Sequence, residues 1–418
     1  MRILHTVEQY SPSVGGMQEV VKQLSEKLVD LGHDVTIATS YHSNRNFNNL
    51  NGVKIKSFKI SGNVVLGYES ETNEIKRYQD FLCNSNFDII TNFAAQQWAT
   101  DLMLEILDKI KTKKIFIPTG FSGLYHPRYK EYFKKIDKWM KQYDLNIFLS
   151  NNYRDINFAR EQKVKKIIVI PNGASADEFL NTEFIDIRVE LNIPKNNFLI
   201  LNVGSHTGTK GHKEAVSIFS KANIKNSTLL IIGNYFNKSN NFHPTFKNKI
   251  KKIIKKLIYP TIGCLNFCQT ASTHFNNLSN NKKIGKKLII VSKSRLETIN
   301  AYKQADLFLF PSNIECSPLV LFEAMASKIP FLTTDVGNSK EIIKWSNGGM
   351  LLPTIKDKKN YSHAQINESA DLLNKLYNNK ALRERLAQNG FNAWQKKFTW
   401  EKITKNYEEQ YKKLIKNL

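Results

Sequence analysis

Residues 307–336 read LFLFPSNIECSPLVLFEAMASKIPFLTTDV and contain a strand–helix–strand pattern. The apolar runs near its two ends predict buried strands, and the apolar stretch that follows the Ser-Pro pair at 317–318 predicts a helix. Two strands that are joined through a helix lie parallel in one sheet. The stretch therefore predicts an α/β fold in which helices cover both faces of a parallel sheet.

The same pattern fills most of the chain, in two series. The first series begins with the strand-like run RILHTV at 2–7, and the second begins with FLILNVGS at 198–205. A polar segment that contains proline and glycine separates them, which predicts a linker near 175–195. We therefore expect three parts: an N-terminal domain at 1–180, a C-terminal domain at 190–390 and a C-terminal helix at 391–418. Whether the C-terminal helix returns to the N-terminal domain is left open.

Composition and charge narrow the class of protein. The 418 residues are 41% hydrophobic and 23% charged, which is typical of a soluble globular protein, and no run of 18 apolar residues predicts a membrane span. The formal net charge of +24 favours anionic partners. Only ten of the 61 basic residues are arginine, and no RNP or zinc-finger motif is present, so we expect no nucleic-acid partner. The start of the chain does not resemble a signal peptide, which favours a cytoplasmic location.

Two basic amphipathic stretches leave membrane attachment open. In FKNKIKKIIKKLIYP at 246–260 and YKEYFKKIDKWMKQY at 129–143, apolar residues gather on one helical face and lysines on the other. Such helices can lie on an anionic membrane surface. The alternative that we favour for each stretch alone is an ordinary surface helix with a lysine-rich polar face.

The four cysteines predict no metal site. Cys264 and Cys268 are the only close pair, and their segment CLNFC lacks the C-x-x-C spacing that is usual in metal and redox motifs. We expect reduced thiols in a cytosolic protein.

Two glutamates, Glu315 and Glu323, raise the question of function. On one continuous helix they would lie about 12 Å apart, beyond the separation of about 5–9.5 Å that glycoside hydrolysis needs. Ser317 is a good N-cap and Pro318 suits the first helical position, so Glu315 is expected in the preceding loop and Glu323 on the second turn. Carboxylates accept hydrogen bonds from sugar hydroxyls, and the helix N-terminus between them suits a diphosphate. The pair is thus either a grip on a nucleotide sugar or, for Glu323, a contact within the domain.

Five ordered segments resemble the retaining glycosyltransferases of family 4. They are the Glu-x7-Glu motif E315-CSPLVLF-E323, LILNVGSHTGTKG at 199–211, AYKQADLFLFPS at 301–312, SPSVGGMQEVV at 11–21 and VIPNGASADEF at 169–179. The resemblance covers nearly the whole chain and is weakest at about 235–285. It implies the GT-B architecture, an α/β fold of two Rossmann-like domains that face a central cleft.

The resemblance also implies roles for single residues. Glu315 would hold hydroxyls of the transferred sugar and Lys210 would stabilise the leaving diphosphate, so these two are the expected catalytic residues. Glu323 would hold the ribose. The other expected donor-binding residues would contact the donor through backbone N–H groups or would let the backbone approach it closely. They are Gly15, Gly16, Gly204, Ser317, Leu319 and Val320.

Three departures from the family's pattern bear on the site. Pro318 replaces the commoner glycine and has no N–H group to donate. Ser205 and His206 stand where relatives carry an arginine, so Lys210 acts alone or Arg295 or Lys213 substitutes, with His206 considered as a phosphate ligand. Relatives also carry a histidine after the strand-like run KKIFIP at 113–118, where this chain has Thr119 and Gly120. These two residues and the nearby His126 are the candidates on the acceptor side.

The resemblance implies a retaining, metal-independent glycosyltransferase without a cofactor. The expected donor is a nucleotide sugar, with UDP as the nucleotide. The expected acceptor is a glycan or lipid-linked glycan in cell-surface polysaccharide or lipopolysaccharide synthesis. The protein is expected in the cytoplasm, and its peripheral attachment to the inner face of the cytoplasmic membrane is left open. Two alternatives remain: a non-catalytic relative that binds nucleotide sugar or glycan, and a soluble glycosyltransferase that acts on a sugar phosphate.

Overall fold

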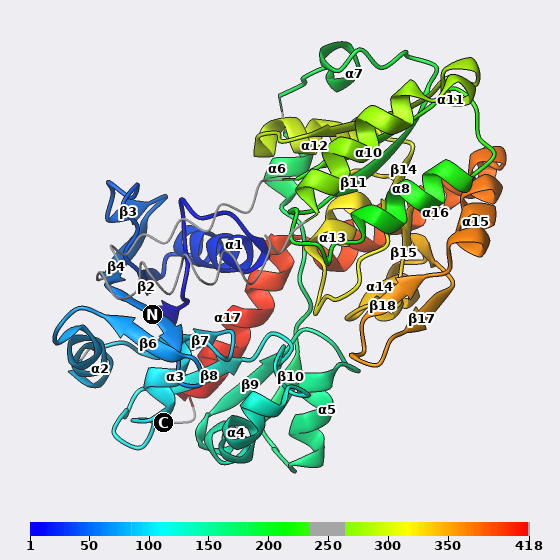
Figure 1. Ribbon diagram of the computed structural model, residues 1–418. Helices are drawn as coiled ribbons and strands as arrows, with labels where there is room; N and C mark the ends of the chain where they lie inside the picture. Colours follow the sequence, from blue (N-terminus) through cyan, green and yellow to red (C-terminus); the bar gives the residue numbers. More distant parts are fainter. Residues whose placement is uncertain (85, 182, 234–263, 417–418) are drawn as a thin grey trace. The chain divides into compact units, whose positions relative to one another are not determined.

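The computed structural model of the chain describes all residues except 85, 182, 234–263 and 417–418 (Figure 1). The chain forms two compact units. The first unit comprises Met1–Asn172 together with Trp400–Leu418, and the second comprises Gly173–Thr399. Each unit contains a parallel sheet that is covered by helices, so the expected α/β fold class is confirmed.

The sheet of the first unit has eight strands in the order β10-β9-β8-β7-β1-β2-β4-β3, and only the β3–β4 pair is antiparallel. The strands of this unit, including the separate β5–β6 hairpin, are β1 (Arg2–Thr6), β2 (Asp34–Ser40), β3 (Asn49–Leu50), β4 (Val53–Phe58), β5 (Ile60–Asn63), β6 (Gly67–Ser70), β7 (Ile89–Phe93), β8 (Lys113–Ile117), β9 (Leu145–Phe148) and β10 (Ile167–Val169). The helices are α1 (Gly16–Asp30), α2 (Glu74–Asn84), α3 (Trp98–Leu104), α4 (Lys130–Gln142), α5 (Arg154–Glu161) and α17 (Trp400–Lys416), with a 3₁₀ turn at Pro127–Tyr129.

Helix α4 decides the outcome for one of the two basic stretches. Its apolar side chains Tyr132, Phe133, Ile136 and Met140 are buried in the core of the first unit, while its lysines remain on the outer face. Because the apolar face is already packed, it is not available to a bilayer, and the ordinary surface helix is the better description. The other stretch, 246–260, lies outside the described residues. Among the described residues, no helix is long and apolar enough to cross a membrane.

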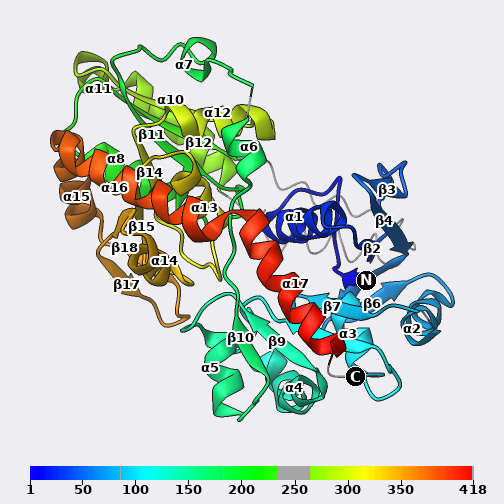
Figure 2. The same cartoon turned by 180° about the vertical axis from the view of Figure 1, so that it is seen from behind.

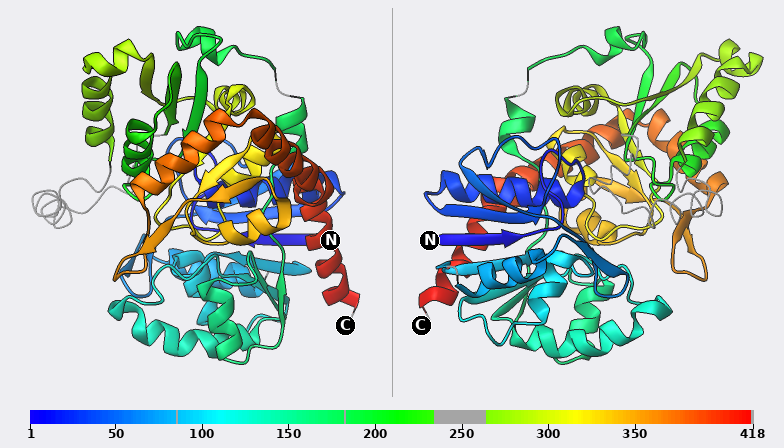
Figure 3. Two further views of the ribbon diagram at one scale, coloured as in Figure 1. Left: turned by 90° about the vertical axis from the view of Figure 1, so that its right-hand side faces the viewer. Right: turned by 60° about the vertical axis from the view of Figure 1, so that its left-hand side comes forward.

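The C-terminal helix α17 packs with the first unit, where it contacts α1 (Figures 2 and 3). Its buried residues include Trp400, Ile403, Tyr407 and Tyr411. The Tyr411 hydroxyl lies 3.0 Å from the hydroxyl of Thr91 on β7. The end of the chain is thus part of the same core as its beginning.

The sheet of the second unit has six parallel strands in the order β13-β12-β11-β14-β15-β16. The strands of this unit, including the antiparallel β17–β18 pair, are β11 (Phe198–Val203), β12 (Ser227–Ile232), β13 (Lys286–Val291), β14 (Leu307–Phe310), β15 (Phe331–Thr333), β16 (Gly349–Leu351), β17 (Thr354–Lys356) and β18 (Ser362–Ala364). The helices are α6 (Ala176–Leu180), α7 (Ile187–Glu190), α8 (His212–Lys221), α10 (Leu265–Asn277), α11 (Ser279–Lys283), α12 (Arg295–Gln304), α13 (Leu319–Ala326), α14 (Ser339–Ser346), α15 (Ile366–Asn378) and α16 (Lys380–Ala393), followed by a π-helical turn at Trp394–Phe398.

Strand order marks a ligand-binding position in each sheet. In the second unit the chain adds β12 and β13 on one side of β11 and then β14 on the other, so the order reverses between β11 and β14. In the first unit the reversal lies between β1 and β7. Open α/β sheets bind ligands beyond the carboxyl ends of the strands at such a switch point. The loops that follow these four strands are therefore the places to look for a site.

Candidate functional site

The loops that follow β11 and β14 are held together at the switch point of the second unit. The amide of Asn313 donates to the carbonyl of Thr209 at 2.9 Å, and the Ser312 hydroxyl oxygen lies 3.1 Å from the same carbonyl oxygen. Gly211 makes this approach possible, because a Cβ there would lie 1.8 Å from the carbonyl oxygen of Pro311. Its φ of 70° is also in the region that favours glycine.

Lys210 and Glu315 form an ion pair between these two loops. The Nζ atom of Lys210 lies 2.7 Å from Oε1 of Glu315, and the Ser312 hydroxyl donates to the same oxygen at 2.8 Å. The side chains are 27% and 11% exposed, so both retain access to a ligand. Gly204 accommodates the lysine stem, since a Cβ at this glycine would lie 3.1 Å from Cβ of Lys210. The structure thus brings together the two residues that the sequence proposes as catalytic.

Glu323 lies on the second turn of α13 and is 6% exposed. Its Oε1 atom is 2.6 Å from Nη1 of Arg295, and Nη2 of Arg295 is 2.8 Å from Oε2 of Glu178. The contact within the domain that we considered for Glu323 is therefore present. Arg295, which we considered as a substitute for the family's arginine, is placed beside Glu323 at the first residue of α12.

The start of α13 differs by one residue from the prediction. The helix begins at Leu319, and Pro318, with φ −69° and ψ 112°, is the N-cap rather than the first helical residue. The prediction that Ser317 is the N-cap is therefore wrong. The hydroxyl of Ser317 accepts a hydrogen bond of 3.1 Å from Nδ2 of Asn338. Leu319 and Val320 are the first two helical residues and are half-buried. Their amides belong to the helix N-terminus, which attracts anions.

Gly15 and Gly16 lie between β1 and α1, at the switch point of the first unit. Gly15 is the N-cap of α1 in an extended conformation and is half-buried, whereas Gly16 is the first helical residue and is exposed. This loop and the loop after β7 are joined by a hydrogen bond of 2.7 Å from the amide of Glu8 to Oε1 of Gln97.

Thr119 and Gly120 follow β8 and have left-handed backbones, with φ of 57° and 104°. For a β-branched residue such as Thr119 this conformation is strained, and strain of this kind gathers at functional sites. The Gly120 amide donates to Oδ2 of Asp155 at 2.8 Å. Burial raises the pKa of Asp155 to about 6.

His126 is exposed and precedes the 3₁₀ turn, where its Nδ1 accepts a hydrogen bond of 3.2 Å from the amide of Arg128. It lines an open pocket of about 680 Å³ on the surface of α4 and α5, together with Leu124, Tyr125, Pro127, Lys130, Phe133, Lys134, Asp137, Phe158 and Gln162. This lining does not include Thr119 or Gly120. The structure thus gives His126 surroundings that differ from those of the other two acceptor-side candidates.

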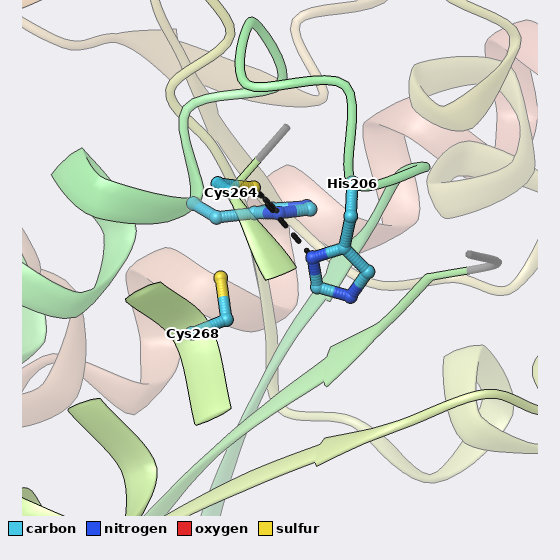
Figure 4. A group of neighbouring side chains, drawn as sticks. His206, Cys264 and Cys268 are labelled. Atoms are coloured by element: carbon cyan, nitrogen blue, oxygen red, sulfur yellow. Dashed lines mark hydrogen bonds between the residues drawn. The ribbon is translucent and has the colours of Figure 1, made fainter. Parts of the chain in front are cut away.

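Two features escaped the sequence analysis. Ser312, which bonds both the lysine-bearing loop and Glu315, gave no signal because serines are common after strands. The second feature is a buried group of side chains, His206, His212, Cys264 and Cys268, whose possible ligand atoms all lie within 4.8 Å of one another (Figure 4). His206, which we considered as a phosphate ligand, belongs to this buried group. The signal was present as a pair of histidines and a pair of cysteines at short spacing, but the two pairs lie far apart in the sequence.

Comparisons with known proteins bear on the family and the fold. The model of the family "Glycosyl transferases group 1" matches residues 183–393, and that of "Glycosyltransferase Family 4" matches residues 14–178. An uncharacterized glycosyltransferase of Methanocaldococcus jannaschii is 23% identical over 432 residues, which cover 99% of this chain and 98% of that protein.

Two solved structures show the same fold over their whole length. Sucrose-phosphate synthase from Thermosynechococcus elongatus superposes with a TM-score of 0.74 at 16% identity, and all of both chains is covered. HepE of Anabaena, solved in complex with UDP-glucose, superposes with a TM-score of 0.69 at 12% identity, again with full coverage of both chains. Because the first family model spans just over half of the sequence, the chain belongs to the glycosyl transferases group 1, a family of glycosyltransferases with the GT-B fold.

Proposed function

We propose that this protein transfers a sugar from a UDP-sugar to a glycan or lipid-linked glycan acceptor with retention of configuration. The observation that supports the donor site best is the Lys210–Glu315 pair, which lies at the switch point of the second sheet. A cation suited to phosphate and a carboxylate suited to hydroxyl groups are thus held on adjacent loops, as a nucleotide sugar requires.

Each donor group has a partner in this proposal. The ammonium group of Lys210 and the amides at the start of α13 take the diphosphate, because both present positive charge to it. Glu315 accepts hydrogen bonds from hydroxyls of the transferred sugar, and Glu323 accepts them from the ribose. Arg295, through its 2.6 Å contact, fixes the orientation of the Glu323 carboxylate.

The proposed reaction breaks the bond between the anomeric carbon and the diphosphate oxygen and forms a bond from that carbon to the acceptor oxygen. The acceptor approaches from the face that the diphosphate leaves, so the configuration is retained, and the acceptor proton passes to the departing phosphate. Lys210 stabilises the negative charge that develops on the diphosphate, which is the role that a divalent ion has in other transferases. The transfer step therefore needs no metal in this proposal.

The acceptor side of the proposal is assigned to the first unit. The glycine loop before α1 and the strained Thr119–Gly120 turn lie at the carboxyl ends of β1 and β8, where this class of sheet binds its ligands. We propose an acceptor from cell-surface polysaccharide or lipopolysaccharide synthesis, presented at the cytoplasmic face of the membrane. The net charge of +24 favours an acceptor or surface that is anionic.

The test is turnover of a panel of nucleotide sugars, with release of the free nucleotide as the readout. We expect slow hydrolysis of one UDP-sugar by the wild-type protein and faster release when a matching lipid-linked glycan is added. Lys210→Ala should lower kcat by about 10²–10³-fold, because one charge-stabilising group is lost from the transition state. Glu315→Gln should lower it as well, since the amide is a weaker acceptor for the sugar hydroxyls.

Matched controls come from helix α15. Glu368→Gln and Lys375→Ala make the same two chemical changes at exposed positions and should leave turnover unchanged. Tight binding of nucleotide sugar without turnover, across the donor and acceptor panels, would favour a non-catalytic relative. Turnover that depends on a sugar phosphate rather than on a glycan would favour the soluble alternative.

A further inference from the structure

The buried group at the carboxyl end of β11 combines two imidazoles and two thiols from separate segments. His206 lies in the loop after β11, and His212 is the first residue of α8. Cys264 is the N-cap of α10, and Cys268 lies on the first turn of that helix. All four are at most 3% exposed, which is unusual for two histidines in one place.

The distances within the group are short. The Nδ1 atom of His212 lies 3.1 Å from Sγ of Cys264, and Nδ1 of His206 lies 3.6 Å from the same sulfur. The two imidazole rings meet at a centroid distance of 4.7 Å. In a tetrahedral zinc site with bonds of about 2.0–2.3 Å, the ligand atoms lie about 3.3–3.8 Å apart. The ligand atoms of all four residues lie within 4.8 Å of one another, which is close to that spacing.

The spacing in the sequence also suits a structural zinc site. Five residues separate the histidines and three separate the cysteines, so the pairs read H-x5-H and C-x3-C. Both lie within the ranges that two-cysteine, two-histidine zinc sites use. The C-x-x-C rule that led us to expect no metal considered the cysteines without the histidines that the fold brings to them.

The surrounding backbone is shaped around the group. Gly233, at the end of β12, leaves room for the His206 ring, since a Cβ there would lie 3.1 Å from Nε2 of His206 and 2.2 Å from the carbonyl oxygen of Gly204.

We infer that His206, His212, Cys264 and Cys268 bind one structural Zn²⁺ ion in tetrahedral geometry. Four protein ligands leave no open position, as in other structural zinc sites, so the ion takes no part in the chemistry. The two histidines stand at either side of residues 207–211, which include Lys210. The ion therefore fixes both ends of this loop to the start of α10. Its effect on donor binding, through the position of Lys210, rests on the proposed function.

The first test is the metal content of the full-length protein, measured by elemental mass spectrometry. The protein is purified without an affinity tag that binds metal. We expect one zinc per chain in the wild type and its loss in Cys264→Ser and in Cys268→Ser. Cys83→Ser is the matched control, because Cys83 is exposed and lies outside the group, and it should retain the zinc. Zinc in the wild type that persists in both Cys264→Ser and Cys268→Ser, or a wild type that takes up no zinc, would overturn the inference.

A second test does not depend on the folding of variants. Wild-type protein is stripped with a chelator and reloaded with Co²⁺, which should give the visible absorption of tetrahedral cobalt with bands from thiolate ligands. The midpoint of thermal unfolding should fall on stripping and recover with Zn²⁺, since an ion that binds only the folded state stabilises it. A disulfide between Cys264 and Cys268 in freshly purified protein, or octahedral cobalt without thiolate bands, would contradict the assignment. Neither readout uses a sugar donor, so failure of the proposed transferase activity would leave this inference standing.

Discussion

Glycine at position 211 shows how a single residue controls the site. The loop that carries Lys210 can approach the end of β14 only because position 211 has no side chain and tolerates a φ of 70°. The sequence suggested a phosphate-binding loop here through its resemblance to a family, but no local rule revealed that Gly211 touches Pro311, which lies 100 residues further along the chain. Contacts of this range depend on the order of the strands.

Gly211→Ala is predicted to destabilise the second unit by about 2–5 kcal/mol. A left-handed alanine costs about 1–2 kcal/mol, and forcing a methyl group against the Pro311 carbonyl adds about 1–3 kcal/mol. Gly32→Ala is the control, because Gly32 has a φ of 82° and no atom within 4 Å of an added Cβ. Its loss of stability therefore measures the cost of a left-handed alanine alone. Chemical denaturation checks both, and equal losses for the two variants would show that the close approach at Gly211 is absent.

For the proposed catalytic pair, the sequence pointed to the two residues but not to their contacts. The Glu-x7-Glu spacing and the lysine of the loop after β11 pointed to Glu315 and Lys210. Only the structure showed that the ammonium group of Lys210 and the hydroxyl of Ser312 both contact Oε1 of Glu315. The ion pair between Glu323 and Arg295 was equally hidden, since Arg295 stands at the start of another helix.

At the scale of elements, the sequence predicted long and fully buried strands well. The runs at β1, β7, β11 and β12 are mainly apolar and almost wholly buried, because both faces of a parallel strand are covered. The short or half-exposed strands β3, β5 and β6 gave no such signal, since two to four residues are too few to show a period. The start of α13 was displaced by one residue, because Pro318 rather than Ser317 is the N-cap.

Helix α3 carries a pH-dependent element. Burial raises the pKa of Asp101 to about 7, although Val64 and Tyr132 donate hydrogen bonds to it. The folded first unit therefore binds a proton at Asp101 that the unfolded chain, with a pKa near 3.8, has released between about pH 4 and pH 7. Because the folded state binds more protons there, this residue makes stability fall as the pH rises through that window.

Asp101→Asn should reduce that pH dependence. The amide resembles the protonated acid, so the variant should gain stability relative to wild type at pH 8 compared with pH 5. The readout is the difference between the two proteins in the midpoint of thermal unfolding at these two pH values. Asp371→Asn, at an exposed position on α15, serves as the control and should show no change in that difference. The same difference at both pH values for Asp101→Asn would contradict the raised pKa.

At the scale of the whole molecule, the chain crosses between its two units twice, after Asn172 and after Thr399. The two connecting segments are bonded to each other, with the Ala174 amide donating to the Phe398 carbonyl at 3.0 Å. The alternation of strands and helices predicted two domains because each series of strands forms its own sheet. The place of the last helix was left open, because an amphipathic helix suits any apolar surface and only the fold selects one.

The stability of the first unit is predicted to depend on this last helix. Tyr411 is fully buried on α17 and reaches Thr91 on β7. Tyr411→Ala should cost about 3–5 kcal/mol, as for other large aromatic side chains that leave a cavity. Tyr411→Phe should cost only about 1 kcal/mol, for the lost hydrogen bond. Hydrogen exchange at the amides of β1 and α1 measures both, and unchanged protection in Tyr411→Ala would show that α17 does not stabilise this unit.

The decisive experiment for the donor site is a crystal structure of the protein with an unhydrolysed UDP-sugar bound. We expect the diphosphate between Nζ of Lys210 and the amides at the start of α13, the ribose hydroxyls on Glu323, and hydroxyls of the sugar on Glu315. A donor that is bound elsewhere on the chain, with the Lys210–Glu315 pair undisturbed and without contact to it, would rule out the proposed site.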